Sequence, residues 1–211
     1  NINLYYNTIY INANSTGSNF ATSCVYHTAS FTSSTSRLDM RNNILHNISV
    51  PIGSGFDICF RRSGTSLANY SFSSNNNLFF SASTPPGPTK LIYYDGTNAD
   101  EFLDVFKSRV SPREEESVTE TPRYANTLGT APDFLHFSLW EATQSESGAQ
   151  NIPGYTDDFD GDIREGNPGY SGTGTYGPDI GADEGEFTVQ DGIGPVINYT
   201  LLINTSSVFN R

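Results

Sequence analysis

The sequence comprises 211 residues with a net charge of −12 at pH 7, and 16% of its side chains are charged and 13% aromatic. A chain of this length can bury one sizeable core with part of a second domain, and its aromatic content excludes an intrinsically disordered composition. The acidity argues against nucleic acid or an anionic membrane as a partner, and no apolar run approaches the ~18 residues of a membrane-spanning helix.

The chain carries no signal peptide and starts in the middle of a β-rich pattern, at "NINLYYNTIYIN". We therefore interpret the sequence as a piece of a longer protein. Abundant Asn, Ser, Thr, Gly and Tyr favour β-structure with many turns. Of the 23 acidic residues, 21 follow residue 90, so the second half is the part that would attract cations.

Two short motifs recur with a common period in the first hundred residues. The first motif is written three times: "YYNTIYIN" (5–12), "RNNILHNI" (41–48) and "NNNLFFSA" (75–82). It places Asn7, Asn43 and Asn77 at intervals of 36 and 34 residues. The second motif is also written three times: "SCVYHT" (23–28), "ICFRRS" (58–63) and "LIYYDG" (91–96). Two independent motifs with one period indicate a structural repeat.

This period predicts the coil of a parallel β-helix. It is too short for a propeller blade of four full strands, and no 3.6-residue pattern fills it. Short strands separated by Gly, Ser and Asn turns would stack coil upon coil about 4.8 Å apart. The alternative is an antiparallel β-sandwich with coincidental spacing. We predict an all-β fold of about three coils, with an irregular C-terminal cap and one short helix.

The apolar faces of the second motif predict which side chains point inward. We expect two inward stacks: Ile58 with Leu91, and Val25 with Phe60 and Tyr93. We expect three outward rows: Cys24 with Cys59 and Ile92, Asp57 with Lys90, and Tyr26 with Arg61 and Tyr94. The opposite register would bury Arg61 and Asp57, which is costly for charged side chains.

The two cysteines occupy the same strand position one coil apart. Their Cα atoms should therefore lie about 5 Å apart, inside the range that a disulfide spans. Cys24 and Cys59 are thus a candidate disulfide in an oxidising compartment, and the alternative is two free thiols. No cysteine or histidine cluster indicates zinc, and we expect His27, His46 and His136 to be surface or corner residues.

Residues 98–109 depart from the β pattern and predict a short helix against the last coils. Its apolar face comprises Phe102, Leu103, Val105 and Phe106. Residues 111–122 form an acidic loop that we expect to be solvated surface. Residues 127–150 predict a final irregular coil that covers the open end of the stack. The covering side chains are Phe134, Leu135, Phe137, Leu139 and Trp140.

An acid- and glycine-rich stretch near the C-terminus carries a further motif. There "TDDFDGDIREG" (156–166) is followed by "GPDIGADE" (177–184). These segments resemble the closing motif of the secreted bacterial parallel β-helix proteins called the choice-of-anchor Q family. The matching residues are Asp158, Asp160, Gly161 and Arg164, then Asp179, Ile180, Gly181, Ala182 and Glu184. The "NNIL" and "NNNLFF" segments and "ESVTETPRY" are similar to the coils of the same family.

The resemblance covers residues 1–186 and implies a right-handed parallel β-helix that is secreted by a bacterium and attached to the cell surface by a separate anchor. Residues 187–211 resemble a linker and the first strand of an immunoglobulin-like module that often follows such helices. The family name describes variable anchors, so the resemblance implies no particular activity.

Two roles are open for the acidic stretch. Asp158, Asp160 and Asp162 have the alternate spacing of carboxylates that wrap a calcium ion, although the full twelve-residue EF-hand pattern fails. The other role is a structural clamp that closes the last coil, in which Arg164 pairs with Asp160, Asp179 or Glu184. Apart from this candidate calcium site, no cofactor is indicated.

The coils themselves favour binding over catalysis. Up to residue 90 their only acids are Asp39 and Asp57, which lie on different strand series and cannot form the paired carboxylates of a glycoside hydrolase. A row of Tyr26, Arg61 and Tyr94 offers aromatic faces and a guanidinium to a glycan; the alternative is a self-satisfied ladder held by cation–π contacts.

We therefore expect a non-catalytic, extracellular segment that serves adhesion, glycan contact or as a structural stalk. Its expected partners are an extracellular polysaccharide or surface glycan and adjacent modules of the same longer chain, without nucleic acid or direct membrane insertion. The alternative is a polysaccharide lyase or glycoside hydrolase whose catalytic coils lie upstream, because many such enzymes share this fold.

Overall fold

The computed structural model describes residues 1–81, 89–172 and 177–190, in which the chain is all-β with one short helix. The strands are β1 (Ile2–Tyr5), β2 (Thr8–Ile11), β3 (Thr22–His27), β4 (Leu38–Arg41), β5 (Ile44–Asn47), β6 (Asp57–Arg62), β7 (Leu78–Ser81), β8 (Lys90–Tyr94), β9 (Ala99–Asp100), β10 (Ala142–Thr143) and β11 (Thr188–Val189). The helix is α1 (Leu103–Val110). Residues 191–211, predicted to begin an immunoglobulin-like module, lie outside the described part of the chain.

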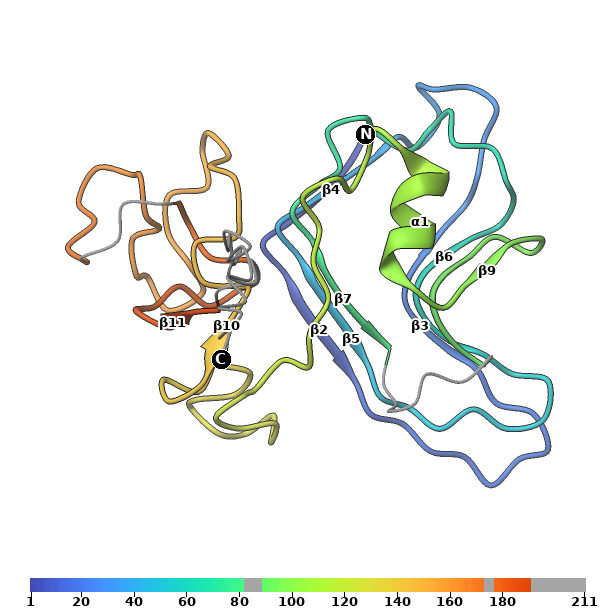
Figure 1. The fold of residues 1–211 in the computed structure, drawn as a ribbon, viewed down its shortest axis with the longest axis horizontal. Coiled ribbons are helices and arrows are strands. Elements are labelled where there is room, and N and C mark those ends of the chain that lie inside the picture. Colours follow the sequence, from blue (N-terminus) through green and yellow to red (C-terminus); the bar gives the residue numbers. More distant parts are fainter. Residues whose placement is uncertain (82–88, 173–176, 191–211) are drawn as a thin grey trace, which may run out of the picture.

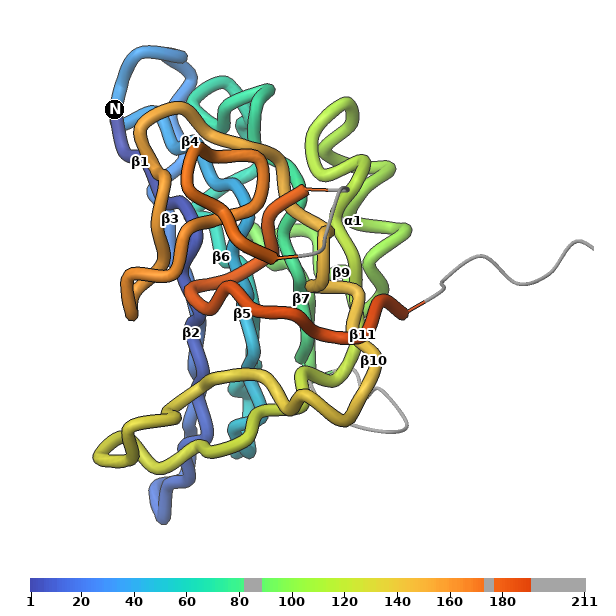
Figure 2. Tube along the Cα trace, turned by 90° about the vertical axis from the view of Figure 1, so that its left-hand side faces the viewer, coloured from blue at the N-terminus to red at the C-terminus, as the bar shows by residue number. Residues whose placement is uncertain are grey.

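Strands one repeat apart pair in parallel, as the two recurring motifs predict. Three sheets result, in the orders β1–β4, β2–β5–β7 and β3–β6–β8, and β9 adds to β8 antiparallel. Successive turns of the chain lie behind one another in Figure 1 and side by side, from blue to green, in Figure 2. The parallel register excludes the antiparallel sandwich for this part of the chain.

A row of asparagines joins the successive turns. Asn7, Asn43 and Asn77 each precede the paired residues of β2, β5 and β7. The Oδ1 of Asn43 accepts the backbone and side-chain N–H groups of Asn7 at 3.0 Å, and the Oδ1 of Asn77 accepts those of Asn43 at 2.9 Å. The preceding residues Tyr6, Asn42 and Asn76 have φ near +55°, so the turn repeats its left-handed corner.

The main core lies between the sheets. It contains Leu38, Met40, Leu45, Cys59, Phe60, Tyr70, Phe79, Ile92, Tyr93, Phe106 and Val110. The adjacent residues Cys59 and Phe60 are both buried in it. Ile58 and Leu91 are buried as predicted but lie outside this cluster, and Ile58 borders a surface hollow together with Arg61. The alternation of faces along β6 is therefore interrupted between Cys59 and Phe60.

This interruption corrects the predicted register in part. The inward stack of Val25, Phe60 and Tyr93 is confirmed. The predicted outward positions of Cys59, Ile92 and Asp57 are wrong, because all three are buried. A strictly alternating strand cannot place two adjacent residues in one core, so the two-residue period fails at this bend.

Burial of Asp57 is compensated by specific partners. The hydroxyl of Thr22 donates to its Oδ1 at 2.8 Å, and the Lys90 ammonium lies 3.5 Å from its Oδ2. Lys90 is itself only partly exposed. The pair predicted to face solvent is instead an internal ion pair between adjacent turns.

The helix α1 closes the end of the stack after the last turn, where Figures 1 and 2 both place it. Its buried residues are Phe106 and Val110, and the Phe106 ring stacks on Tyr93 with centroids 4.8 Å apart. The helix begins later than predicted, and Phe102 and Val105 of its expected apolar face are exposed.

The acidic loop after α1 is not wholly solvated surface. Glu114 is fully buried and adopts φ +60°. Its carboxylate accepts hydrogen bonds from the Tyr70 hydroxyl, the Asn77 amide and the Ser117 hydroxyl. The Glu114 carboxylate thus continues the asparagine row, because it accepts the hydrogen bond of the Asn77 amide. The prediction of a solvated loop is wrong at this residue.

The C-terminal region packs on the outer face of the β2–β5–β7 sheet, as Figures 1 and 2 show. A second core cluster joins them and contains Ile44, Leu78, Phe137 and Ile180. Of the apolar residues predicted to cover the open end, Leu139 and Trp140 are 61% and 92% exposed. This segment covers a sheet face instead, because α1 already occupies the end of the stack.

The packed unit continues beyond the predicted boundary at residue 186. Phe187 packs against Phe137 with ring centroids 5.4 Å apart, and β11 pairs in parallel with β10. The described residues up to Gln190 therefore belong to the same body as the sheets. Nowhere in the described ranges is there a helix long and apolar enough to cross a membrane.

Candidate functional site

A row of Tyr26, Arg61 and Tyr94 crosses the outer face of β3, β6 and β8, as predicted, with Tyr26 exposed and the other two partly exposed. The backbone register aligns the three residues. The Arg61 guanidinium carbon lies 5.5 Å from the Tyr26 ring centroid and 5.8 Å from that of Tyr94. Tyr26 is 59% exposed, so its ring offers a free face to solvent.

A hollow of about 360 Å³ lies beside this row and includes Arg61 and Tyr94 in its wall. Its other lining residues are Asn19, Phe20, Ala21, Ser54, Gly55, Phe56 and Ile58. The Phe56 ring lies 5.1 Å from the Tyr94 ring, which extends the aromatic surface. No carboxylate of the described residues lies within 4 Å of the Arg61 guanidinium, so its donors face the hollow without an ion-pair partner.

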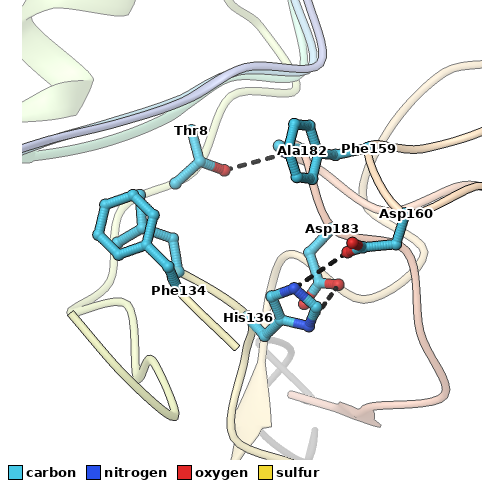
Figure 3. A pocket seen from close by; sticks show the side chains of 8 residues that line it. Thr8, Phe134, His136, Phe159, Asp160, Ala182 and Asp183 are labelled. Carbon is cyan, nitrogen blue, oxygen red and sulfur yellow. Dashed lines mark hydrogen bonds and ion pairs between the residues drawn. The ribbon is translucent and has the colours of Figure 1, made fainter. Parts of the chain in front are cut away.

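A second hollow, of about 250 Å³, lies where the C-terminal region meets β2 (Figure 3). Its apolar walls are Phe134, Leu135 and Phe159, and its polar groups are His136, Asp160 and Asp183. The Nε2 of His136 lies 3.0 Å from Asp160 Oδ2, and its Nδ1 lies 3.6 Å from Asp183 Oδ1.

The two carboxylates of this hollow differ in their surroundings. Asp160 is exposed, whereas the Asp183 side chain is 12% accessible and its Oδ2 accepts the Phe137 backbone N–H at 2.8 Å. Burial raises the pKa of Asp183 above its ordinary value, and the Phe137 amide and His136 oppose that rise. An apolar hollow with a few convergent polar groups has the composition of a binding site.

The predicted structural clamp is present, and Glu184 is the one of its three predicted carboxylates that pairs with Arg164. Arg164 is buried, and its Nη1 lies 3.2 Å from Glu184 Oε2 while its Nη2 donates to the carbonyls of Gly181 and Ala182. Its guanidinium carbon also lies 4.0 Å from the Tyr6 ring centroid. The predicted pairing with Glu184 is therefore confirmed.

The other two predicted partners of Arg164, Asp160 and Asp179, contact other residues. Asp160 lies against His136, and Asp179 accepts the backbone N–H groups of Ser147 and Gly185. Burial and the charges of neighbouring glutamates raise the pKa of Asp179 to about 9. Burial also raises the pKa of Glu184, against the lowering effect of two backbone amides and Arg164.

Gly181 explains why the closing motif needs glycine. It adopts φ +111°, and a Cβ there would lie 2.6 Å from Ile44 Cδ1. The backbone N–H of Gly181 donates to Asn42 O, and that of Ala182 donates to Thr8 Oγ1 (Figure 3). The motif thus fastens the C-terminal region directly to the sheet.

The alternate acidic residues do not form the predicted calcium loop. The Oδ1 of Asp158 accepts the backbone N–H groups of Asp160, Gly161 and Asp162, and its Oδ2 accepts that of Glu184. Both oxygens of the first candidate ligand are occupied by amides, and Asp160 turns toward His136. Asp158 therefore caps a turn, and the three carboxylates do not converge.

The candidate disulfide is not formed, because Cys24 and Cys59 are both free thiols. Cys59 is fully buried and its Sγ lies 3.3 Å from the carbonyl oxygen of Leu45. Burial raises the pKa of Cys24 to about 12 and holds that of Cys59 well above its ordinary value. The two thiols thus behave as small apolar side chains of the core.

Sequence reasoning missed the association of His136 with Asp160 and Asp183. It treated His136 as an isolated surface or corner residue and Asp183 as part of the closing motif. His136 and Asp183 are 47 positions apart, and no regular spacing relates the two. The only signal was an acidic, glycine-rich stretch in a chain with three histidines.

Comparisons of this chain with protein-family models, with curated proteins and with solved structures find no match.

Proposed function

We propose that this chain is the C-terminal part of a right-handed parallel β-helix protein of the choice-of-anchor Q type, secreted by a bacterium and displayed at its surface. Parallel pairing of strands one repeat apart supports this architecture, as does the asparagine row between turns. Right-handed connections are the rule for parallel strands of one sheet. The closing motif packs on the first turns, which suits a terminal seal.

We further propose that the segment binds a glycan through the row of Tyr26, Arg61 and Tyr94 and does no chemistry of its own. The observation that carries this proposal is a partly exposed guanidinium between two tyrosine rings at the edge of a hollow. Sugar rings pack their C–H faces on aromatic rings, and a guanidinium presents five N–H donors to hydroxyls or a carboxylate.

The cation–π contacts alone do not account for Arg61. Both ring distances are close to the ~6 Å limit at which such contacts contribute, and an exposed contact contributes only about 0.5–1 kcal/mol. The donors of the guanidinium have no carboxylate partner within the described residues. If the row were held only by its own cation–π contacts, the N–H donors of Arg61 would be hydrogen-bonded to water. A glycan carboxylate or a pair of glycan hydroxyls would accept hydrogen bonds from these donors.

The acids of the coils support a binding role rather than catalysis. Asp39 forms an ion pair with Arg41 at 2.8 Å and accepts the Tyr5 hydroxyl. Asp57 is buried beside Lys90. Each carboxylate is engaged internally, and the two lie on different sheets.

A glycan array tests this proposal, with neutral and uronic-acid-containing oligosaccharides and with four forms of the full chain. The forms are wild type, Arg61→Ala, Tyr94→Ala and the control Phe31→Ala. Phe31 is 93% exposed and lies outside the row and its hollow, so it controls for loss of any exposed aromatic ring.

We expect wild type and Phe31→Ala to bind the same glycans, and the other two variants to bind them about tenfold or more weakly. Equal binding by wild type and Arg61→Ala would overturn the proposed face. Absence of binding by a folded wild type to every glycan would favour the structural stalk.

A further inference from the structure

Three separate segments of the C-terminal region bring an imidazole and two carboxylates to one point. His136 follows the apolar Phe134–Leu135 pair, Asp160 lies in the turn capped by Asp158, and Asp183 lies in the closing motif. One ligand atom from each of the three residues lies within 4.8 Å of the other two. Figure 3 shows the carboxylates directed at the imidazole from two sides.

This arrangement gathers negative charge around one imidazole and favours a cation. A neutral imidazole has one N–H, so it can donate to only one of the two carboxylates that face its nitrogens. Within the described residues, no Lys or Arg forms an ion pair with Asp160 or Asp183. Asp158, whose carboxylate caps the same turn, adds a third negative charge nearby.

We propose that His136, Asp160 and Asp183 form a binding site for a divalent transition-metal ion of the zinc class. One imidazole nitrogen with two carboxylate oxygens is a ligand set that suits zinc, whereas calcium prefers oxygen ligands alone. Side-chain rotations would bring these atoms to the ~2.0–2.2 Å ligand distances of zinc, because the atoms already lie within 4.8 Å of one another.

The surroundings of the three residues suit this role. The Phe137 backbone N–H fixes Asp183 through its Oδ2 and leaves Oδ1 toward His136. Such hydrogen bonds from outside the coordination sphere orient metal ligands and strengthen binding.

Three protein ligands leave at least one coordination position open to the hollow. Water or a small ligand with a carboxylate or hydroxyl group could occupy this position, because the cavity of about 250 Å³ adjoins the three polar groups. The ion would also link His136 to the two segments that Arg164 and Asp158 already join through Glu184. This site adjoins β2, whereas the proposed glycan face lies on β3, β6 and β8, so the two sites are independent.

The test is a titration of the full chain, stripped with a chelator, with Zn²⁺ and with Co²⁺. Calorimetry gives stoichiometry and affinity, and the visible absorption of Co²⁺ reports nitrogen and oxygen ligation directly. The variants are His136→Gln, Asp160→Asn and Asp183→Asn. The matched control is Asp162→Asn, which removes an exposed charge from the same acidic turn but not from the cluster.

We expect one ion per chain, a Co²⁺ spectrum, and weakening by about tenfold or more in each of the three variants. Asp162→Asn should bind as wild type does, and Ca²⁺ should not compete at equal concentration. Circular dichroism checks the folding of every variant. Asp160 is exposed, so Asp160→Asn carries the test even where Asp183→Asn fails to fold.

Three results would overturn the proposal. One is the absence of saturable Zn²⁺ or Co²⁺ binding to folded wild type. Another is undiminished binding by His136→Gln or Asp160→Asn. The third is equal weakening by Asp162→Asn, since this would indicate nonspecific attraction to an acidic turn.

Discussion

The side-chain oxygen of Asn77 accepts hydrogen bonds from both the backbone nitrogen and the side-chain nitrogen of Asn43, at 2.9 Å each. Asn43 offers the same acceptor to Asn7 in the preceding turn. Each amide group therefore donates along the stack in one direction and accepts in the other. This polar row runs beside the sheets and fixes the vertical alignment of the turns.

The first prediction concerns this row. Asn43→Ala should lower the free energy of unfolding by about 3 kcal/mol, because it leaves several buried groups without partners. Asn43→Asp should be worse at pH 7, since a carboxylate would face the carbonyls of Leu4 and Arg41 that now accept its amide. Urea unfolding of both variants measures this, with the exposed Asn3→Ala as a control. A loss below 1 kcal/mol in Asn43→Ala would contradict the role of the row.

A second prediction concerns His46, which is buried with neither ring nitrogen hydrogen-bonded within the described part of the chain. Its ring lies among Tyr10, Phe80 and Tyr124. Burial lowers the pKa of His46 to about 4 from 6.5. Between pH 6.5 and about pH 4, the His46 imidazole is protonated in the unfolded chain but stays neutral in the folded chain. The free energy of unfolding should therefore fall as pH falls through this window.

The size of that loss follows from the shift, on the order of 3 kcal/mol once the pH reaches 4. His46→Phe should remove this component and raise stability at neutral pH, because Phe has no polar atoms to bury. Melting temperatures between pH 4 and 7 would show a shallower slope for His46→Phe than for wild type. Identical slopes would show that His46 is not buried in its neutral form.

The third prediction concerns alkaline pH. The folded pKa of Asp179, about 9, lies above its unfolded value of 3.8. Between these two values the folded chain holds a proton that the unfolded chain has lost, so stability should decrease as pH rises toward 9. Asp179→Asn should flatten this dependence, at lower absolute stability because one acceptor for the amides of Ser147 and Gly185 is lost. A melting temperature of wild type that is constant from pH 6.5 to 9 would refute this assignment.

A fourth prediction concerns the clamp. Arg164→Ala should destabilise the chain by about 3–5 kcal/mol, because it leaves the buried Glu184 carboxylate without its counter-charge. Adding Glu184→Gln should restore part of that loss. A double-mutant cycle in urea measures the coupling between the two residues. Additive losses would mean that Arg164 acts through Tyr6 and the Gly181 and Ala182 carbonyls alone.

The fifth prediction concerns the thiols. At pH 8 both Cys24 and Cys59 should resist alkylation in the folded chain, because burial raises both pKa values far above that pH. Both should react rapidly in denaturant. Mass spectrometry without reductant should find the mass of two free thiols. Rapid native labelling of Cys59 would contradict its place in the core.

The period of the repeat allowed much of the fold to be predicted. Equivalent residues such as Asn7 and Asn43 must align when strands stack in parallel, so their spacing alone gave the register. The inward or outward direction of side chains could be predicted less well from the sequence. The alternation of inward and outward side chains breaks between Cys59 and Phe60. This break depends on how the strand bends around the core, and no local sequence pattern predicts such a bend.

The C-terminal region was predicted least well for a related reason. Its side chains are positioned by long-range contacts, such as Gly181 against Ile44 and Ala182 against Thr8, rather than by a local period. The composition of the acidic stretch favoured calcium through Asp158, whereas the backbone amides of the turn occupy that carboxylate. His136 could be placed only once the chain was folded.

The measurement that tests the glycan-binding account most directly is a nuclear magnetic resonance titration of the full chain with the array's best oligosaccharide. The account predicts that the shifted backbone resonances cluster at Tyr26, Phe56, Arg61 and Tyr94, on the outer face of β3, β6 and β8. Shifts confined to the hollow of His136, or absent at millimolar oligosaccharide, would contradict it.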